Sequence, residues 1–266
     1  MASITSHTIV RNEDRFIWYA IMSVISEVDR MIIYDTGSTD CTVEVIKSIN
    51  SSKIYFQQIP TTTSAQITNL RRRQLKLTKT DWFMLLDGDE IWNQDTIKQF
   101  TQFATSQPKR VKAVIARTRN CVGDIYHYLP ESTGKYHLKG VTGHLTVRAY
   151  RQLPGYNWIG HYPMEAYADR SHQKINNQNE DLAFFDNFYW HMTHLTRSTS
   201  PDRVLGFRNH KYDLGIAVNT KQQLPKVFFS PAAPKFAHVT KPRSVSYTLT
   251  AAALAPFKYI KNYPTS

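Results

Sequence analysis

Hydrophobic positions in the first half of the chain follow two alternating periods, one typical of strands and one typical of helices. Four short apolar runs have the length of strands and span residues 6–10, 31–35, 53–59 and 82–87. Between them, apolar residues recur at intervals of three and four, which predicts helices over residues 11–28, 38–49 and 64–77. Asp40 is the expected N-cap of the second helix. Strands separated by helices of this length indicate βαβ units and a mostly parallel sheet.

The pattern is looser in the second half of the chain. It predicts helices over residues 97–107 and 201–218, and strands over residues 111–117, 145–151 and 187–195. Residues 118–145 have no clear period, and we expect a long loop or irregular hairpins there. The organisation that this pattern predicts is an α/β domain at 1–200, with halves at about 1–106 and 107–200, followed by a helical or irregular extension at 201–266.

The composition fits one large hydrophobic core, because 41% of the 266 residues are hydrophobic. No apolar stretch approaches the roughly 20 residues that a membrane-spanning helix needs. The first residues lack a basic segment followed by an apolar one, so a secretory signal is not expected. The two cysteines, Cys41 and Cys121, form neither a disulfide framework nor a metal motif. These features favour a reducing cytoplasm.

The net charge of +12 is concentrated near the C-terminus. From Arg203 to the end there are ten Lys and Arg residues and one acid, Asp213. Such a basic segment is typical of a surface for nucleic acid, anionic lipid or an anionic substrate, and it is equally compatible with a solvated face. Residues 244–264 are uncharged at first and then aromatic and basic, which favours either the interface of an anionic membrane leaflet or packing against the domain.

Three acids follow the apolar run at residues 82–86 and surround one glycine, Gly88. Asp87 and Asp89 present hard oxygen ligands in the spacing that suits Mg²⁺ or Mn²⁺, and Glu90 follows them directly. We expect the glycine to allow a tight turn and the close approach of a ligand. An acidic turn after a buried strand is the alternative explanation for this segment.

A second acidic strand end is followed by small and hydroxylated residues, in the sequence DTGSTD at residues 35–40. Asp35 and this turn can hydrogen-bond a nucleotide base or ribose, and Gly37 permits a positive φ. The alternative is a capped turn with no ligand. Because ligands bind at the carboxyl ends of parallel strands, we expect Asp35 and Asp87 to point into the same crevice.

These motifs together resemble family 2 glycosyltransferases of the GT-A fold. The segments that carry the resemblance are NED at residues 12–14, DTGSTD and DGDE at residues 87–90, in this order and spacing. The resemblance covers residues 8–100 closely and continues loosely to about residue 216. It implies a Rossmann-like three-layer sandwich, with the nucleotide-binding half at residues 1–106. It also implies metal-dependent, inverting transfer of a sugar from a nucleotide diphosphate, with a UDP-sugar favoured.

The resemblance also implies roles for individual residues. Asp35 accepts a hydrogen bond from the base, and Arg71, the first of three successive arginines, faces the nucleotide sugar. Arg72 and Arg73 are expected to be solvated or to meet phosphate. The remaining donor contacts are expected from Val10, Arg11, Asn12, Glu13, Gly37, Asp87, Gly88 and Arg197. The metal ligands are expected to be Asp87, Asp89 and a late histidine, with His194 preferred to His191 because it lies nearer the strand end.

Inverting transfer requires a general base to deprotonate the acceptor hydroxyl. The acid that matches the family pattern is Glu165, although Met164 stands where many relatives have histidine. Asp169 is the reserve candidate, and an ordinary surface glutamate is the alternative. His127, His137 and His144 do not have the spacing of a zinc site, and we assign them no metal.

Two other classes of function compete with sugar transfer. A metal-dependent nuclease or basic nucleic-acid-binding protein fits the charge, but no nucleic-acid motif is present and we expect no nucleic-acid partner. A nucleotidyltransferase lacks support, because no Gly-rich phosphate loop follows the first strand. The expected partners are a nucleotide-sugar donor and a glycan, lipid-linked or protein acceptor. A cytoplasmic protein with peripheral contact at the inner membrane face is the expected setting.

Overall fold

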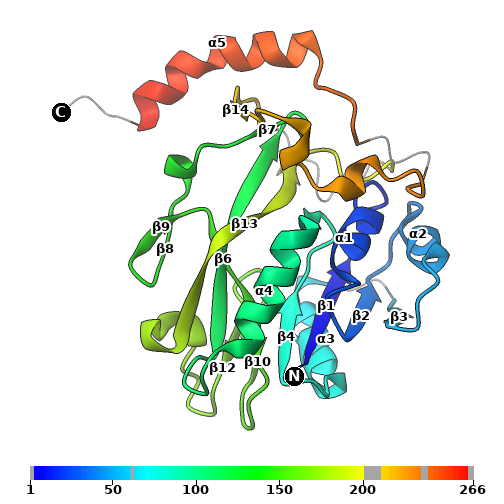
Figure 1. Cartoon of the computed structure of the whole chain (residues 1–266), viewed down its shortest axis with the longest axis vertical. Helices are drawn as coiled ribbons and strands as arrows, with labels where there is room; N and C mark the ends of the chain where they lie inside the picture. Colours follow the sequence, from blue (N-terminus) through cyan, green and yellow to red (C-terminus); the bar gives the residue numbers. More distant parts are fainter. Residues whose placement is uncertain (1–2, 61–62, 201–210, 235–238, 263–266) are drawn as a thin grey trace.

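The four apolar runs of the first half form adjacent parallel strands, as predicted. In the computed structural model these strands are β1 (Ile4–Val10), β2 (Arg30–Asp35), β3 (Ile54–Gln58) and β4 (Trp82–Leu85), in the spatial order β4-β1-β2-β3. The structure describes residues 3–60, 63–200, 211–234 and 239–262, with the backbone alone at residues 257–262 (Figure 1). Because the strands are parallel, their carboxyl ends lie at one edge of the sheet.

The helices between these strands are α1 (Ile17–Val24), α2 (Thr42–Ser48) and α3 (Ser64–Leu77), and α4 (Gln94–Ser106) follows β4. The helix predicted at residues 64–77 is confirmed at both ends, and Thr63 and Gln66 form a capping box at its start. The first helix begins six residues later than predicted. Asn12 has a φ of 54°, and the turn after it is bonded to residues 38–42 instead of continuing a helix.

The N-cap of α2 is Cys41 and not Asp40. Asp40 instead accepts hydrogen bonds from the backbone N–H and the hydroxyl of Thr42, at 2.9 and 2.5 Å. Its side chain therefore still satisfies the start of the helix, one residue earlier than the cap position.

The second half of the chain extends the same sheet. The longer strands are β6 (Ala113–Val122), β10 (Leu145–Arg151) and β13 (Leu182–His194), and the short ones are β5 (Glu90–Ile91), β7 (His127–Tyr128) and β14 (Ile216–Ala217). Within the described residues the order is β14-β7-β6-β10-β4-β1-β2-β3, and β13 pairs with both β5 and β6. Two separate hairpins are formed by β8 (Tyr136–Leu138) with β9 (Val141–Gly143), and by β11 (Asn157–Ile159) with β12 (Ala166–Ala168). Single 3₁₀ turns lie at Glu131–Thr133, Ile175–Asn177, Asn179–Asp181, Lys221–Gln223 and Lys226–Phe229.

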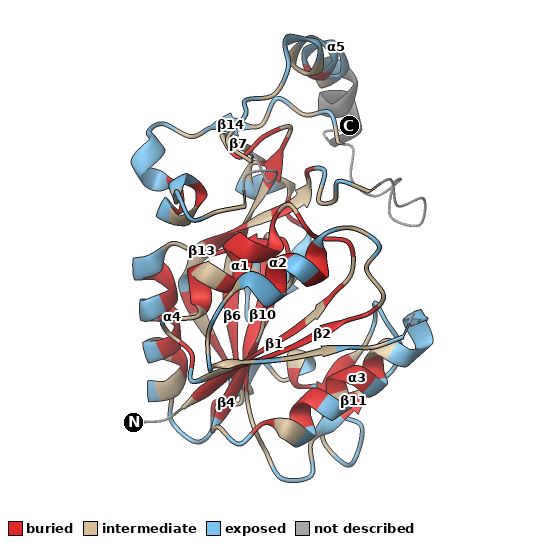
Figure 2. Ribbon diagram, turned by 90° about the vertical axis from the view of Figure 1, so that its right-hand side faces the viewer, coloured by how far each residue is buried: buried red, intermediate tan, exposed pale blue. Residues whose placement is uncertain are grey.

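Both faces of the sheet are buried. Along β4, Trp82 and Met84 pack in one core with α1, α2 and α4, whereas Phe83 packs in a second core with Leu75 of α3 and Trp158 of β11. This alternation follows the two-residue period of a strand. Figure 2 shows the buried residues on the strands and on the inner sides of the helices. The fold is therefore a mixed α/β arrangement of three layers, with a sheet that is mostly parallel at its centre, as predicted.

The predictions for the irregular segments have different outcomes. For residues 118–145 the hairpin alternative is confirmed and the long loop is wrong, because β6 continues to Val122 and pairs with β7, and β8 pairs with β9. The helix predicted at 201–218 is wrong for residues 211–218, where β14 pairs with β7 instead. Gly215, with a φ of 62°, lets the chain approach the backbone of Tyr128 closely at this point. Residues 201–210 of that prediction lie outside the described part of the chain.

The C-terminal extension contains one long helix, α5 (Val245–Asn262), which lies apart from the layers of the sheet (Figure 1). Among the described residues no helix has both the length and the apolar character needed to cross a membrane. Cys41 and Cys121 are both free, in agreement with the expectation that they form no disulfide.

Gln74 of α3 joins the helix to the sheet. Its side chain is fully buried, and its Nε2 donates to the carbonyl oxygens of Thr8 and Ile32 at 2.8 and 2.9 Å. These carbonyls belong to the adjacent strands β1 and β2, so one amide holds α3 against both strands that lead to the acidic edge.

We predict that Gln74→Met lowers the free energy of unfolding by about 1–3 kcal/mol, because two buried carbonyls lose their donor while side-chain volume is retained. Chemical denaturation followed by circular dichroism measures this change. Gln99→Met on the exposed side of α4 is the matched control and should change stability by less than about 0.5 kcal/mol. Equal stability of the two variants would contradict the role of Gln74.

Candidate active site

The carboxyl ends of β1, β2 and β4 gather the acidic residues that the sequence singled out. Val10 at the end of β1 pairs with Asp35 at the end of β2. Gly88, just beyond β4, lies against the same end of β1. Asp35 and Asp87 therefore follow β2 and β4, the two strands that flank β1, at the same edge of the sheet. That they point into one crevice stays a prediction.

Asp35 organises the turn that follows it. Its Oδ1 accepts hydrogen bonds from the backbone N–H groups of Gly37 and Ser38, both at 3.1 Å, and its Oδ2 accepts from the Ser38 hydroxyl. Gly37 has a φ of 92°, the conformation that the sequence predicted for this glycine. Asn12 joins this turn to the end of β1, because its Oδ1 accepts from the N–H of Thr39 at 2.8 Å.

Gly88 allows two chain segments to approach closely. A Cβ at this position would lie 3.0–3.2 Å from side-chain carbons of Glu13 and Val10. The tight turn that the sequence argument expected at this glycine is present, because the N–H of Glu90 donates to the carbonyl oxygen of Asp87 at 3.1 Å. The φ of Gly88 is not positive, so close packing is the structural reason for a glycine here. The absence of a side chain at residue 88 therefore brings Glu13 into the acidic group.

The four carboxylates of this group differ in exposure. The residues Glu13, Asp89 and Glu90 are 5%, 2% and 0% exposed, whereas the Asp87 side chain is 38% exposed. Burial raises the pKa of Glu90 to about 7, and the neighbouring Arg148 opposes this shift. Burial and then Asp89 raise the pKa of Glu13 well above its usual value. Asp87 is therefore the carboxylate of the group that solvent reaches most easily.

Arg148 of β10 is a residue that sequence reasoning missed as part of the site. It is 6% exposed, and its guanidinium lies 2.5 Å from Oε1 of Glu90 and 3.4 Å from Oδ2 of Asp87. Its Nε donates to the hydroxyl of Tyr189 on β13 at 2.7 Å. An arginine within an apolar strand segment, LTVRAYR, was the available signal, because a buried cation requires a buried anion.

The three successive arginines of α3 have different partners, because successive residues of a helix lie on different sides of it. Arg71 is buried and lies 3.8 Å from Oδ1 of Asp87. Arg72 donates to the carbonyl of Trp158, and Arg73 donates to the Gln57 side chain. Arg73 is exposed, as expected of a solvated arginine, whereas Arg72 is half-buried through its bond to Trp158.

Arg197 joins two of the buried acids. Its Nη1 lies 2.7 Å from Oε1 of Glu13 and 3.5 Å from Oδ2 of Asp89. His191 lies on another side of Asp89, with its Nε2 3.5 Å from Oδ1. Burial would raise the pKa of Asp89, but His191 and Arg197 together outweigh burial and hold that pKa well below its usual value. Asp89 also raises the pKa of His191 against the effect of burial.

A short segment after β13 fastens Arg197 to the N-terminal half. Ser198 donates to Oδ2 of Asp40 at 2.5 Å, and the N–H of Thr199 donates to Oδ1 of Asp14 at 2.9 Å. Asp14 is fully buried and was not among the predicted site residues. Its position in the NED triplet was the signal that could have identified it. Asp14 and Asp40 therefore position the segment that carries Arg197.

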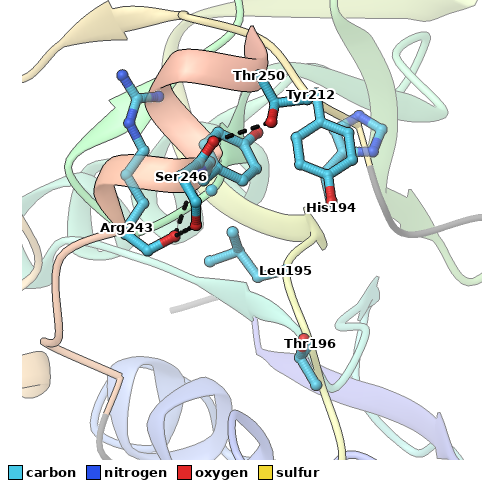
Figure 3. A pocket seen from close by; sticks show the side chains of 10 residues that line it. His194, Leu195, Thr196, Tyr212, Arg243, Ser246 and Thr250 are labelled. Carbon is cyan, nitrogen blue, oxygen red and sulfur yellow. Dashed lines mark hydrogen bonds between the residues drawn. The ribbon is translucent and has the colours of Figure 1, made fainter.

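The two late histidines lie in different environments. His191 contacts the acidic group, whereas His194, which the sequence argument preferred, lines a cavity of about 390 Å³ beside Tyr212, Arg243 and Tyr247 (Figure 3). Burial and then Lys211 lower the pKa of His194 to about 4, so its imidazole is neutral at neutral pH. The structure therefore brings His191, and not His194, to Asp89.

The two candidates for the general base, Glu165 and Asp169, have different surroundings. Glu165 lies just before β12, and its Oε2 is buried without a hydrogen-bond partner among the described residues. Burial raises the pKa of Tyr150 to about 12, and Glu165 acts in the same direction, whereas Arg148 and Arg71 oppose it. Asp169 instead accepts from the N–H groups of Ser171 and Gln173, both at 2.9 Å, and stabilises the turn after β12.

The other predicted residues have simpler surroundings. Arg11 is half-buried, and its Nε has no hydrogen-bond partner in the described part of the chain. His127, His137 and His144 bond to Asp124, Thr142 and Asn120 respectively, each within its own segment or the adjacent strand. These contacts explain the three histidines without a metal.

The carboxylates at the edge of the sheet fit a divalent cation as hard oxygen donors. No group of three or more His, Cys, Asp or Glu side chains in residues 3–60, 63–200, 211–234 and 239–256 is arranged to hold a metal. Two carboxylates are nevertheless sufficient for Mg²⁺ or Mn²⁺ when substrate phosphates and water complete the coordination. The exposed Asp87 and the adjacent Asp89 are consistent with such an open site.

We predict that Arg148→Met lowers the free energy of unfolding by about 3 kcal/mol, because Glu90 is then left buried without its cationic partner. The double variant R148M/E90Q should recover part of this loss, since neither charge remains. Denaturant unfolding measures both values, and Arg110→Met at an exposed arginine is the control. If R148M and R110M were equally stable, the pairing of Arg148 with Glu90 would not stabilise the fold.

Known proteins to which this chain is similar include a mycoplasma protein and two proteins of solved structure. An uncharacterized glycosyltransferase of Mycoplasma genitalium, MG060, is 33% identical over 117 residues, which are 40% of this chain and 38% of that protein. Residues 1–349 of TarS from S. aureus, solved with UDP, align with 13% identity over 71% of this chain and 60% of that chain, at a TM-score of 0.48. Glucosyl-3-phosphoglycerate synthase from Mycobacterium tuberculosis, solved with Mn²⁺ and UDP-glucose, aligns with 20% identity over 44% of each chain, at a TM-score of 0.37.

This chain spans less than two thirds of the length of each of these relatives. The family comparison covers a larger part of this chain. The model of glycosyl transferase family 2 matches residues 7–174, more than half of the chain. The matched segment includes the turn after Asp35, the acidic group after β4, Arg148 on β10 and Glu165 before β12. The chain therefore belongs to glycosyl transferase family 2.

Proposed function

We propose that this protein transfers a sugar from a nucleotide diphosphate donor, with a UDP-sugar favoured, to an acceptor hydroxyl with inversion at the anomeric carbon. The observation that carries the proposal is the group of four carboxylates and three arginines at the carboxyl ends of parallel strands, where ligands of α/β sheets bind. Family membership supports transfer of a glycosyl group. The donor, the stereochemistry and the base are parts of the proposal.

The donor is proposed to lie along the edge of the sheet from β2 to β4. Asp35 and the end of β1, residues 10–13, receive the nucleoside, with Gly37 leaving room beside Asp35. Arg71 faces the sugar side of the donor next to Asp87, and Arg197 faces the diphosphate next to Asp89. The buried Arg148 is proposed to position Asp87 and Glu90 and to make no donor contact of its own.

The charges at this edge support a requirement for a divalent cation. The three guanidinium groups and His191 each already contact a carboxylate of the group, so the cationic side chains at this edge are engaged before a diphosphate arrives. We propose that Asp87 and Asp89 hold Mn²⁺ or Mg²⁺. His191 is proposed to be the histidine nearest this site, and His194 to be outside it. When bound, the cation neutralises the negative charge that develops on the leaving diphosphate.

Glu165 is proposed to be the general base. It would accept the proton of the acceptor hydroxyl while that oxygen bonds to the anomeric carbon and the bond from this carbon to the diphosphate oxygen breaks. Its Oε2 is buried and has no hydrogen-bond partner in the described residues, so it is available to accept a proton. Asp169 remains the reserve candidate, although its carboxylate already accepts two backbone N–H groups.

The acceptor is proposed to be a glycan, a lipid-linked molecule or a protein side chain. Residues 1–200 would form the catalytic domain, with its acceptor side at about 107–200, and residues 201–266 a basic extension. A cytoplasmic location with peripheral contact at an anionic membrane face is the proposed setting.

The net charge of +12 supports one alternative of a different class, namely a metal-dependent nuclease or nucleic-acid-binding protein.

We predict that UDP with Mn²⁺ raises the melting temperature, whereas UDP without metal or Mn²⁺ alone has a smaller effect. Differential scanning fluorimetry with UDP, GDP and CDP, each with and without Mn²⁺, measures this shift. Asp89→Asn should abolish the metal-dependent part, and Asp95→Asn, at an exposed acid of α4, should retain it. Stabilisation by oligonucleotides and by no nucleoside diphosphate would favour the alternative function.

We predict that Glu165→Gln retains the nucleotide-dependent shift in melting temperature but lowers turnover about 100-fold or more, because only proton transfer is removed. Release of UDP from UDP-glucose and related UDP-sugars, with water or added sugars as acceptors, measures turnover. Asp169→Asn is the matched control and should retain activity. Loss of activity in D169N together with full activity in E165Q would exchange the roles of the two acids.

A further inference from the structure

Helix α5 has one side on the protein body and one side in solvent. Ala251 is 1% exposed, and the hydroxyl of Tyr247 accepts a hydrogen bond from the N–H of Asp213 at 3.2 Å. These contacts identify the inner side of the helix. On the opposite side, the apolar residues Val245 and Leu249 are 76% and 65% exposed.

The exposed apolar residues form a continuous stripe. With about 3.6 residues per turn, positions separated by three or four residues lie on one side of a helix. Among the residues whose side chains are described, the outward side of α5 consists of Val245, Leu249, Ala252, Ala253 and Pro256, all exposed. We call these five residues the outer stripe. Burying such side chains is favourable, so an apolar side left in water indicates a partner.

The charge of the surrounding sequence indicates what kind of partner this is. Residues 214–266 contain seven Lys and Arg residues and no Asp or Glu. A helix with an outward apolar side in a segment that carries only positive charge is typical of helices that lie in the interface of an anionic membrane. A second copy of this chain would bring a second segment of the same positive charge against the first, which Coulomb repulsion disfavours.

The helix also lies at the end of the molecule that carries the acidic group. Its first turns line the cavity of Figure 3 through Ser246 and Thr250, and the opposite wall of this cavity is His194 to Thr196. The next residue is Arg197, which contacts Glu13 and Asp89. A surface in contact with α5 is therefore adjacent to the proposed donor site.

We propose that the outer stripe docks on an anionic lipid surface, with the helix lying parallel to it. Val245, Leu249 and Pro256 enter the boundary between headgroups and acyl chains, and the basic segment attracts the anionic headgroups. This surface holds the edge of the sheet that carries Asp87 and Arg197 close to the membrane. The docking itself does not depend on which reaction the site performs.

The test is sedimentation of the purified full chain with two kinds of vesicle, phosphatidylcholine alone and phosphatidylcholine mixed with phosphatidylglycerol. We predict binding to the mixed vesicles that weakens as salt concentration rises, and little binding to the neutral ones. The affinity of V245E/L249E for the mixed vesicles should be lower by about tenfold or more, because apolar burial is lost and negative charge is added.

The matched control is Q99E/Q102E, which adds the same two charges to exposed positions of α4 and should bind like the unmodified protein. Glutamate is a good helix former, and circular dichroism should show unchanged helix content in both variants. Equal binding of V245E/L249E and the unmodified protein would overturn the proposal, as would no binding to either vesicle. Concentration-dependent dimerisation lost in V245E/L249E, without vesicle binding, would assign the outer stripe to a second copy. The nucleotide-dependent melting shift tests the proposed transferase separately.

Discussion

The structure depends on compensating several buried carboxylates at one edge of a parallel sheet. Glu13, Asp89 and Glu90 are almost completely excluded from solvent, and isolated charges in such surroundings are very unfavourable. Their compensating cations come from β10 and from the segment after β13, as Arg148 and Arg197. The second half of the chain is therefore required to complete the acidic edge that the first half builds.

This arrangement has a consequence for the proposed chemistry. The cations at the edge already contact carboxylates, so an incoming diphosphate would meet cationic side chains that are engaged with acids. In the proposed mechanism a divalent cation bound together with the donor would supply positive charge, and the partly exposed Asp87 is the carboxylate best placed to receive it. Arg148, by contrast, is held between Glu90 and Tyr189, and in this proposal it would act on the donor only through the acids that it positions.

The extension after residue 200 contacts the rest of the protein at two places. β14 pairs with β7 at the margin of the sheet, and α5 borders the cavity that His194 lines. The outer stripe of α5 therefore lies at the same end of the molecule as the acidic group. Donor binding and membrane docking, as proposed here, would involve adjacent surfaces of one protein.

Local patterns in the sequence were sufficient to predict most of the secondary structure in the first half of the chain. The period of apolar residues predicted β1 to β4 and both ends of α3, and the order of the acidic motifs predicted their common edge, because both signals depend on neighbours in the chain. Distant contacts decided the rest. The pairing of residues 216–217 with β7, the choice of His191 beside Asp89, and Arg148 as the partner of Glu90 each join segments tens of residues apart. A periodicity carries no information about such contacts, since they form only when the sheet brings the segments together.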